Sequence, residues 1–487
     1  MTSARSVEAD AILPAYCQVL GVTDQRVGVG GVAFGIRFEL RLPERWNRRF
    51  FFQGGAGTDG VIFPPVGLVQ GLAGASGGEH PALARGFAVV ATDAGHQGFG
   101  QEFGLDPQAR IDYGYRALDV VTRLAKEIVA RRYGRPAKRS YFIGCSNGGR
   151  QAMLASQRFP DQFDGIVAAD PGFRLTRVPI GETWDVQTLT AIAPKDGAGK
   201  PILSQALSDA DLKLVADRVL AACDALDGLA DGLVDAPSAC RFDPGTLACP
   251  GAKTASCLSA EQVAALRRIF DGAHDSHGTP LYPGWPWDAG IGAAGWRQWK
   301  LGGSPTATPD ALNTQIGLGI LRYVFFTPPD PTFDQLAFDF DVDPARTLAA
   351  APTIDATSTD LAAFRRRRGK LIMFTGLADP VFSAKDLVAY YDDLVAAQGG
   401  LKATRAFARL FLVPGMNHCG GGPALDRFDT LDAIVRWVEH GRAPAKLVTT
   451  GLLFPGRTRP HCPYPEESRY RGRGNPEKAS SFHCMTP

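Results

Sequence analysis

The pattern of apolar and polar side chains predicts a series of short strands separated by helices. Phe34, Ile36, Phe38, Leu40 and Leu42 alternate with glycine and charged residues, which is typical of a strand with one buried face. Short apolar runs predict further buried strands at 49–53, 86–92, 140–144, 165–169, 370–375 and 410–413. Apolar residues recur at helical spacing within 116–132, 387–394 and 431–438. Because strands and helices alternate, the predicted fold class is α/β, with a doubly wound and mostly parallel sheet.

This alternation stops near residue 172 and resumes near residue 370. The stretch between is rich in proline, glycine, alanine and tryptophan, and it holds four of the nine cysteines. We therefore interpret residues 1–172 and 370–487 as two parts of one domain and residues 173–369 as a large inserted lid domain. The chain is long enough for such an arrangement.

The motif with the clearest chemistry is Gly-Cys-Ser-Asn-Gly at residues 144–148. An apolar run precedes it and good helix formers follow it, so Ser146 is predicted to lie on a sharp strand-to-helix turn. A Gly-x-Ser-x-Gly pattern is common by chance, but this context favours the nucleophile elbow of an α/β-hydrolase. The glycine-rich loop at 54–57 follows an earlier strand, where this fold presents a backbone N–H to an oxyanion; a surface turn is the alternative. The predicted oxyanion donors are backbone N–H groups of Asn147, Gly55 and Gly57.

Two later strand ends supply the partners that a serine nucleophile needs. An imidazole must take the serine proton, and a carboxylate must orient that imidazole. Asp379 and His418 each follow a predicted strand, and the order Ser146, Asp379, His418 is that of an α/β-hydrolase triad. Taken singly, an Asp-Pro turn and a surface histidine are the alternatives. Taken together with the elbow, the three residues predict a catalytic triad.

Composition indicates a globular protein and excludes two kinds of partner. The 487 residues are 45% hydrophobic and carry a formal net charge of +2, so there is no basic excess for nucleic acid. No apolar run approaches the roughly 20 residues of a membrane span. The N-terminus lacks the apolar core of a signal peptide, so we expect either a cytosolic protein or an exported one whose leader is absent from this chain.

The nine cysteines bear on that choice. Cys145 precedes the predicted nucleophile and Cys419 follows the predicted base, so a Ser–His hydrogen bond would bring both near disulfide spacing; two buried free thiols are the alternative. The remaining cysteines form pairs at short, loop-closing separations: Cys223 with Cys240, Cys249 with Cys257, and Cys462 with Cys484. Only Cys17 is left, which suggests a partner on a missing N-terminal piece. Disulfides on this scale favour a secreted or periplasmic protein.

These motifs resemble the tannase and feruloyl esterase family of α/β-hydrolases, which includes mono(2-hydroxyethyl) terephthalate hydrolases. The resemblance covers nearly the whole chain and rests on Leu-Pro-Ala-Tyr-Cys at 13–17, Gly-Cys-Ser-Asn-Gly-Gly-Arg at 144–150 and Asn-His-Cys-Gly at 417–420. A Cys-Ser pair matched with a distant His-Cys pair is specific to this family. The resemblance implies a Cys145–Cys419 disulfide at the active site and a lid over the substrate pocket. The family usually bonds the equivalent of Cys17 to an upstream cysteine, which this sequence lacks.

An acidic loop at residues 224–235 predicts a metal site. Its carboxylates recur every three or four residues among glycines, which suits Ca²⁺, although the spacing is not that of an EF-hand. Spacing alone leaves calcium and a solvated acidic loop equally favoured. The resemblance implies a structural calcium, distant from the chemistry, in a loop closed by Cys223 and Cys240. By that resemblance its ligands are the side chains of Asp224, Asp227 and Asp231 and the carbonyls of Leu229 and Leu233.

The resemblance also bears on the substrate, a small-molecule ester of an aromatic acid. Phe382, shortly after Asp379, resembles the family's aromatic wall, and Trp296 or Trp299 is a candidate for the opposite wall. We expect feruloyl or related hydroxycinnamoyl esters first and gallate esters second. A terephthalate monoester needs a cation for its free carboxylate. The polar residues near the expected substrate loop are Asn313, Gln315 and Arg322, and none aligns as that cation. The hypothesis of another class is an inactive secreted binding module, against which the intact triad argues.

Overall fold

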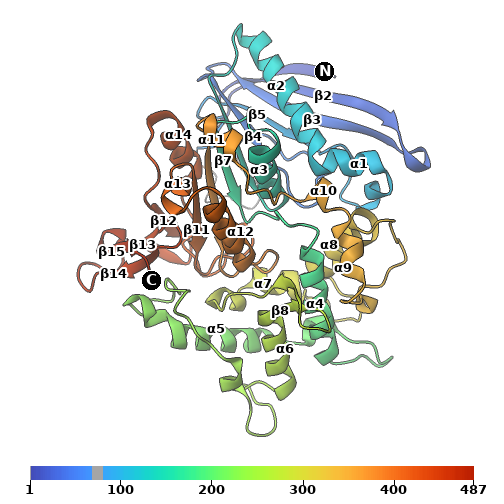
Figure 1. The fold of residues 1–487 in the computed structure, drawn as a ribbon, viewed down its shortest axis with the longest axis vertical. Helices are drawn as coiled ribbons and strands as arrows, with labels where there is room; N and C mark the ends of the chain where they lie inside the picture. Colours follow the sequence, from blue (N-terminus) through green and yellow to red (C-terminus); the bar gives the residue numbers. More distant parts are fainter. Residues whose placement is uncertain (1, 68–79) are drawn as a thin grey trace.

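A nine-stranded sheet forms the centre of the computed structural model, which describes residues 2–67 and 80–487 (Figure 1). In spatial order the strands are β1 (Ser3–Val7), β2 (Tyr16–Val27), β3 (Ala33–Pro43), β5 (Ala88–Thr92), β4 (Arg49–Gln53), β6 (Arg139–Cys145), β7 (Gly165–Ala169), β10 (Lys370–Gly376) and β11 (Ala408–Val413). The strands from β5 to β11 are parallel, and β1, β2 and β3 are antiparallel. The predicted α/β class with a mostly parallel sheet is confirmed.

The sequence pattern does not predict β1 and β2. Strand β1 is exposed along nearly its whole length, and β2 is buried in its first half but largely exposed in its second. Neither strand therefore shows a sustained apolar alternation. They form an antiparallel pair at the edge of the sheet, with Val7 opposite Tyr16.

The parallel strands are buried on both faces, which explains their continuous apolar runs. Phe50 and Phe52 of β4 point into one core, whereas Phe51 between them points into the other. The first core also receives α2 (Ala117–Tyr133), α3 (Asn147–Arg158) and α12 (Ala384–Ala397), and the second receives α14 (Thr430–His440). The sheet is thus doubly wound. The short helices α1 (Pro107–Ile111) and α13 (Leu401–Arg405) complete this part of the chain.

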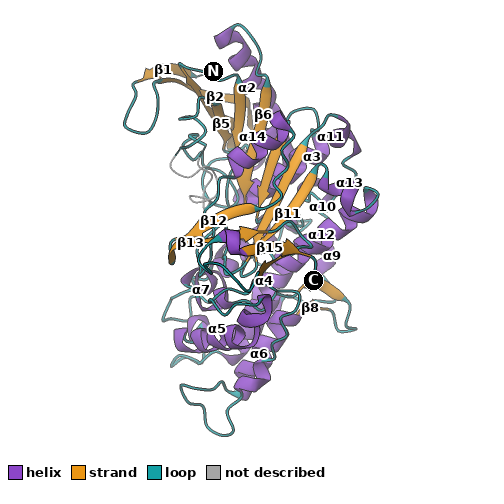
Figure 2. Ribbon diagram, turned by 90° about the vertical axis from the view of Figure 1, so that its left-hand side faces the viewer, coloured by secondary structure: helices purple, strands orange, loops and turns teal. Residues whose placement is uncertain are grey.

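A long insertion, defined here as residues 170–369, connects β7 to β10. Its elements are α4 (Val178–Ile192), α5 (Asp209–Cys223), α6 (Ala260–Asp271), β8 (Gly272–His274), β9 (Pro280–Pro283), α7 (Ala294–Lys300), α8 (Leu312–Ile320), α9 (Asp343–Leu348), α10 (Ala351–Ile354) and α11 (Ala362–Arg366). In both ribbon views α5 and α6 lie at the far end of the molecule from β1 (Figures 1 and 2). The insertion contacts the strand ends directly: Asn417 donates its side-chain amide to the Gly290 carbonyl at 3.1 Å.

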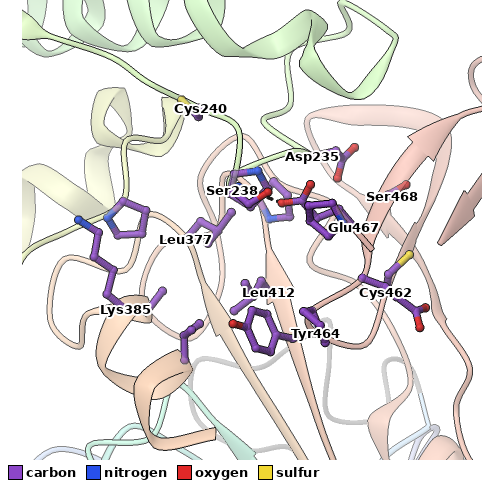
Figure 3. A pocket seen from close by; sticks show the side chains of 18 of the residues that line it. Asp235, Ser238, Cys240, Leu377, Lys385, Leu412, Cys462, Tyr464, Glu467 and Ser468 are labelled. Carbon is purple, nitrogen blue, oxygen red and sulfur yellow. Dashed lines mark hydrogen bonds between the residues drawn. The ribbon is translucent and has the colours of Figure 1, made fainter. Parts of the chain in front are cut away.

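The C-terminal segment forms two small hairpin sheets, from β12 (Leu447–Gly451), β13 (Phe454–His461), β14 (Glu467–Tyr470) and β15 (Phe482–Met485). Between this segment, α12 and the insertion lies a cavity of about 1010 Å³, shown in Figure 3. Leu377, Leu412, Tyr464, Trp287 and several prolines line it. None of Ser146, Asp379 and His418 lines it, so the chemistry predicted from the sequence lies elsewhere.

Candidate active site

Ser146 lies on a turn between β6 and α3, as its motif predicts. Its φ of 63° is in the left-handed region, which a non-glycine residue adopts only under the constraint of its surroundings. The flanking glycines permit this turn, because a Cβ on Gly144 would lie 2.2 Å from the Gly148 carbonyl oxygen. The serine side chain remains partly exposed at the N-terminus of α3, where the helix dipole favours negative charge.

His418 and Asp379 form a hydrogen-bonded pair at the ends of neighbouring strands. The His418 Nδ1 atom lies 2.9 Å from Asp379 Oδ2, while Asp379 Oδ1 accepts the backbone N–H groups of Val381 and Phe382. Burial lowers the pKa of His418, but the Asp379 charge and hydrogen bond, together with Asp170, raise this pKa to a net value above the ordinary one. His418 Nε2 has no hydrogen-bond partner among the described residues, so it is the nitrogen that can accept a proton.

A disulfide links the residue before Ser146 to the residue after His418. Cys145 and Cys419 are bonded, with their Cα atoms 6.0 Å apart. The other three predicted pairs are also bonded: Cys223 with Cys240, Cys249 with Cys257, and Cys462 with Cys484. All four predicted pairings are therefore confirmed, and Cys17 is a free, half-buried cysteine.

The predicted oxyanion donors differ in how free their N–H groups are. Asn147 opens α3, where backbone N–H groups lack helical acceptors. The Gly55 N–H already donates to Gln151 Oε1 at 3.1 Å, so it is a weaker candidate than the sequence suggested. Gly57 is exposed, has a φ of 56°, and a Cβ added there would meet nothing within 4 Å. The Gly55 N–H is thus occupied, while the roles of Asn147 and Gly57 stay predictions.

A buried network that the sequence analysis does not predict joins this loop to α3. The Asp59 carboxylate accepts hydrogen bonds from the side-chain amides of Asn147 and Gln151. Arg150, which is fully buried, donates to Asn147 Oδ1 and to the carbonyls of Gly114, Tyr113 and Ile354. Burial raises the pKa of Asp59 to about 7. Only the seven-residue motif at 144–150 hinted at Arg150, and nothing in the sequence singled out Asp59.

Two aromatic rings pack edge-on against the His418 ring, one from the insertion and one from the segment after β10. Phe382 and Trp299 each lie 5.2 Å from it between ring centroids. Trp299 is half-buried, whereas Trp296 is only 3% exposed and lies near the ammonium of Lys300 inside the insertion. Trp296 is therefore a packing residue. Of the two tryptophans that the sequence offers as the aromatic wall opposite Phe382, only Trp299 contacts His418 among the described residues.

The acidic loop contains buried oxygens without hydrogen-bond partners. Asp224 accepts the backbone N–H groups of Asp231 and Gly232, and these bonds fold the loop around its carboxylate. One carboxylate oxygen on each of Asp227, Asp231 and Asp235 is buried and has no partner among the described residues. Burial raises the pKa of Asp227 to about 6, and that of Asp235 well above its ordinary value. Asp235 stands in the acidic pattern, but the sequence analysis does not name it as a ligand.

The donor set of this loop suits a hard cation, with one geometric condition. Among the described residues, the three-membered group with ligand atoms within 4.8 Å of one another is Cys145, Asp170 and Cys419, whose sulfurs are in a disulfide and cannot bind as thiolates. The acidic-loop carboxylates are more widely spaced. A Cys223–Cys240 disulfide closes the loop, and the buried guanidinium of Arg459 contacts Asp231. A bound ion would have to draw these carboxylates together.

A serine on a strand-to-helix elbow and a buried histidine–aspartate pair at the ends of parallel strands are features of the α/β-hydrolase class. The chain belongs to the tannase and feruloyl esterase family, whose model matches residues 17–485. It is a carboxylic ester hydrolase. No helix among the described residues is long and apolar enough to span a membrane.

Three comparisons illustrate this membership. The chain is 45% identical to the mono(2-hydroxyethyl) terephthalate hydrolase of Piscinibacter sakaiensis, over 100% of this chain and 87% of that protein. It is 30% identical to a probable feruloyl esterase B-2 of Aspergillus terreus, over 92% and 83%. Among solved structures, feruloyl esterase B from Aspergillus oryzae superposes with a TM-score of 0.83 at 25% identity, covering 99% of this chain and 96% of that one.

Proposed function

We propose that this enzyme hydrolyses esters of aromatic carboxylic acids through an acyl-enzyme on Ser146. The observation that carries the proposal is the arrangement around His418. Its Nδ1 bonds to Asp379, and its Nε2 has no partner within the described part of the chain. The Cys145–Cys419 disulfide joins its loop to the strand that leads to Ser146. The aromatic rings of Phe382 and Trp299 lie beside the same imidazole.

In the proposed mechanism His418 Nε2 takes the proton of Ser146 as the Oγ atom attacks the ester carbonyl. Asp379 holds the tautomer in which Nδ1 carries a proton, and its charge stabilises the imidazolium. Backbone N–H groups of Asn147 and Gly57 hold the oxyanion. The imidazolium then protonates the departing alcohol. Water then enters, gives a proton to His418 and attacks the acyl carbonyl. The imidazolium returns that proton to Ser146 Oγ as the acid is released.

Three acyl groups fit this proposal and can be separated experimentally. Feruloyl or related hydroxycinnamoyl esters are our first candidate, because a planar acyl chain suits a slot between Phe382 and Trp299. The 45% identical relative makes a terephthalate monoester the second candidate. That acid needs a cation, but Asn313 is a neutral amide buried without hydrogen-bond partners among the described residues, and Arg322 donates its Nε–H to the Phe333 carbonyl. Gallate esters are the third.

The test is a panel of purified esters: methyl ferulate, methyl gallate, mono(2-hydroxyethyl) terephthalate and short p-nitrophenyl esters. We expect the highest kcat/KM for methyl ferulate. A higher value for the terephthalate monoester would reverse the order of the first two candidates. Labelling with a fluorophosphonate tests the serine itself, and we expect Ser146 to be labelled. An unlabelled protein that hydrolyses none of these esters would support an inactive binding module instead.

We also propose that the acidic loop binds a structural calcium ion. The side chains of Asp224, Asp227, Asp231 and Asp235 would hold it, with the carbonyls of Leu229 and Leu233. Three buried carboxylate oxygens without partners in residues 2–67 and 80–487 support this assignment, because unpaired buried charge is strongly destabilising without a cation. The ion would contribute stability and take no part in ester cleavage.

The four disulfides support the further proposal that the enzyme works in an oxidising compartment, secreted or periplasmic. Thiol quantification under denaturing conditions, on protein recovered from its native host, tests this proposal. We expect about one reactive thiol per chain, that of Cys17. Nine reactive thiols would contradict it.

A further inference from the structure

Four neighbouring parallel strands end at polar residues, and the proposed mechanism uses only three of them. The strand order is β6, β7, β10 and β11. Ser146 directly follows β6, Asp379 follows β10, and His418 follows β11. Asp170 directly follows β7, between the nucleophile strand and the acid strand. This fourth residue is fully buried, and its φ of 34° is unusual for a non-glycine residue.

The Asp170 carboxylate connects three separate parts of the active site. Its Oδ1 accepts the Thr375 hydroxyl at 3.0 Å and the Gly376 N–H at 2.8 Å, both at the end of β10. Its Oδ2 accepts the Cys419 N–H at 3.1 Å, in the loop that carries His418. The same oxygen lies 3.7 Å from the sulfur of Cys145. Two of the three donors are backbone N–H groups, which cannot accept a proton, so the pocket suits a carboxylate.

Folding alone gives little reason for a charged group at this position. Burying a carboxylate is unfavourable, and its three hydrogen bonds offset only part of that desolvation cost. A negative charge beside the catalytic histidine does have a use, because that histidine becomes positive in each proton transfer. The charges that act on Asp170 are those of Asp379 and His418, and the adjacent disulfide does not titrate.

We propose that Asp170 is a positioning residue of the reaction. Its carboxylate fixes the His418 loop through the Cys419 N–H and adds a second negative charge that stabilises the imidazolium. This inference rests on the proposed Ser146 mechanism. Burial and the negative charge of Asp379 raise the pKa of Asp170 to about 8, while His418 and the hydrogen-bond donors oppose that rise. The side chain therefore ionises within the working pH range of a histidine base.

The experiment compares the wild-type full chain with Asp170→Asn and Thr375→Val, using p-nitrophenyl ester hydrolysis across pH 5 to 10. In Asp170→Asn we expect kcat to fall about tenfold to a hundredfold with KM nearly unchanged, the rate equivalent of one to two pKa units of imidazolium stabilisation. The ratio of the wild-type kcat to the variant kcat should rise as the pH increases through about 8, since only the wild type gains the negative charge of ionised Asp170.

Thr375→Val is the matched variant, because it keeps the carboxylate but removes one of its donors. In this variant the pH-dependent rise in kcat should move to higher pH. Without the Thr375 hydroxyl, the ionised form of Asp170 loses a hydrogen-bond donor and its neutral form is relatively favoured. Unchanged kcat in Asp170→Asn would overturn the inference, and so would a lower kcat with an unaltered pH profile, which indicates a structural role alone. If Asp170→Asn does not fold, an unmoved profile in Thr375→Val overturns it. Ser146→Ala tests the proposed function separately. If this variant loses esterase activity, the Ser146 mechanism is supported, whatever result Asp170→Asn gives.

Discussion

The carboxylates at the strand ends and those of the acidic loop differ in their hydrogen bonding. At the strand ends, both oxygens of Asp170 and both oxygens of Asp379 accept hydrogen bonds. In the acidic loop, one buried oxygen on each of Asp227, Asp231 and Asp235 has no partner among the described residues. Both regions gather buried carboxylates and both are stapled by a disulfide. The strand-end carboxylates are met by backbone N–H groups, a hydroxyl and an imidazole.

This difference teaches which region is complete without a ligand. Fixed dipoles at the strand ends stabilise charge before a substrate arrives, so the catalytic groups are preorganised. In the acidic loop Arg459 contacts Asp231, and Arg457 lies 3.8 Å from the same carboxylate. Arg469 is the cation that acts on Asp227. The loop's remaining carboxylate oxygens suit Ca²⁺, because oxygen atoms of the protein replace water molecules in the coordination of this ion. We therefore expect perturbations of the strand ends to change rate, and perturbations of the loop to change stability.

The largest expected effect comes from the nucleophile. Ser146→Ala should lower kcat by several orders of magnitude, on the order of 10⁴-fold or more, because no other group can form the acyl-enzyme. Its Tm should stay within about 2 °C of the wild type, since a partly exposed hydroxyl contributes little to packing. Steady-state kinetics and a thermal melt check both statements. A variant that retained esterase activity would contradict the mechanism.

The next effect concerns the orientation of the base. Asp379→Asn should lower kcat by about 10³- to 10⁴-fold, because the amide favours the wrong tautomer of His418. The wild-type kcat/KM should fall as pH drops through the raised pKa of His418, because the protonated ring cannot act as a base. Removing the Asp379 charge lowers that pKa, so the acid limb of the profile should move to lower pH. An unmoved limb would exclude Asp379 as the partner of His418.

Breaking the active-site disulfide should have a smaller effect on rate. In Cys145→Gly/Cys419→Gly we expect kcat to fall about tenfold to a hundredfold through poorer alignment of Ser146 with His418. The matched control is Cys249→Ser/Cys257→Ser, which removes a disulfide remote from the site and should leave kcat within about twofold. Equal kinetics for the two double variants would show that the bond next to Ser146 has no catalytic role.

The smallest effect on rate, and a clear one on stability, is expected from metal removal. EDTA should lower the Tm by about 3 to 8 °C, and added Ca²⁺ should restore it, since a ligand that binds only the folded state stabilises that state. Asp235→Asn should weaken the response to Ca²⁺, while kcat at 25 °C changes less than about twofold. If EDTA left the Tm of protein purified without metal unchanged, the proposed calcium site would be contradicted.

The strand pattern and the motifs were sufficient to predict the sheet class, the elbow serine and the three short-range disulfide pairs, whereas the Cys145–Cys419 pair was implied by the family resemblance. These features could be predicted because each depends on local sequence: a buried strand has an apolar run, and a turn to a helix needs glycines. The resemblance to a family then linked strand ends that lie far apart in the chain. It could not rank Trp296 against Trp299, because both are tryptophans on one short helix, and only packing decides which ring reaches His418.

The sequence by itself therefore predicted the residues of the proposed triad and where along the chain the sheet is interrupted. Only the tertiary structure decided which side chains and backbone groups surround these residues and form hydrogen bonds near them. Asp170 follows an ordinary apolar strand, and its role is visible only once Thr375 and Cys419, over 200 residues away in the chain, donate to its oxygens. Asp59 is likewise defined by its bond to Gln151. Such partners meet only across the folded sheet, so no local pattern of apolar and polar residues encodes them.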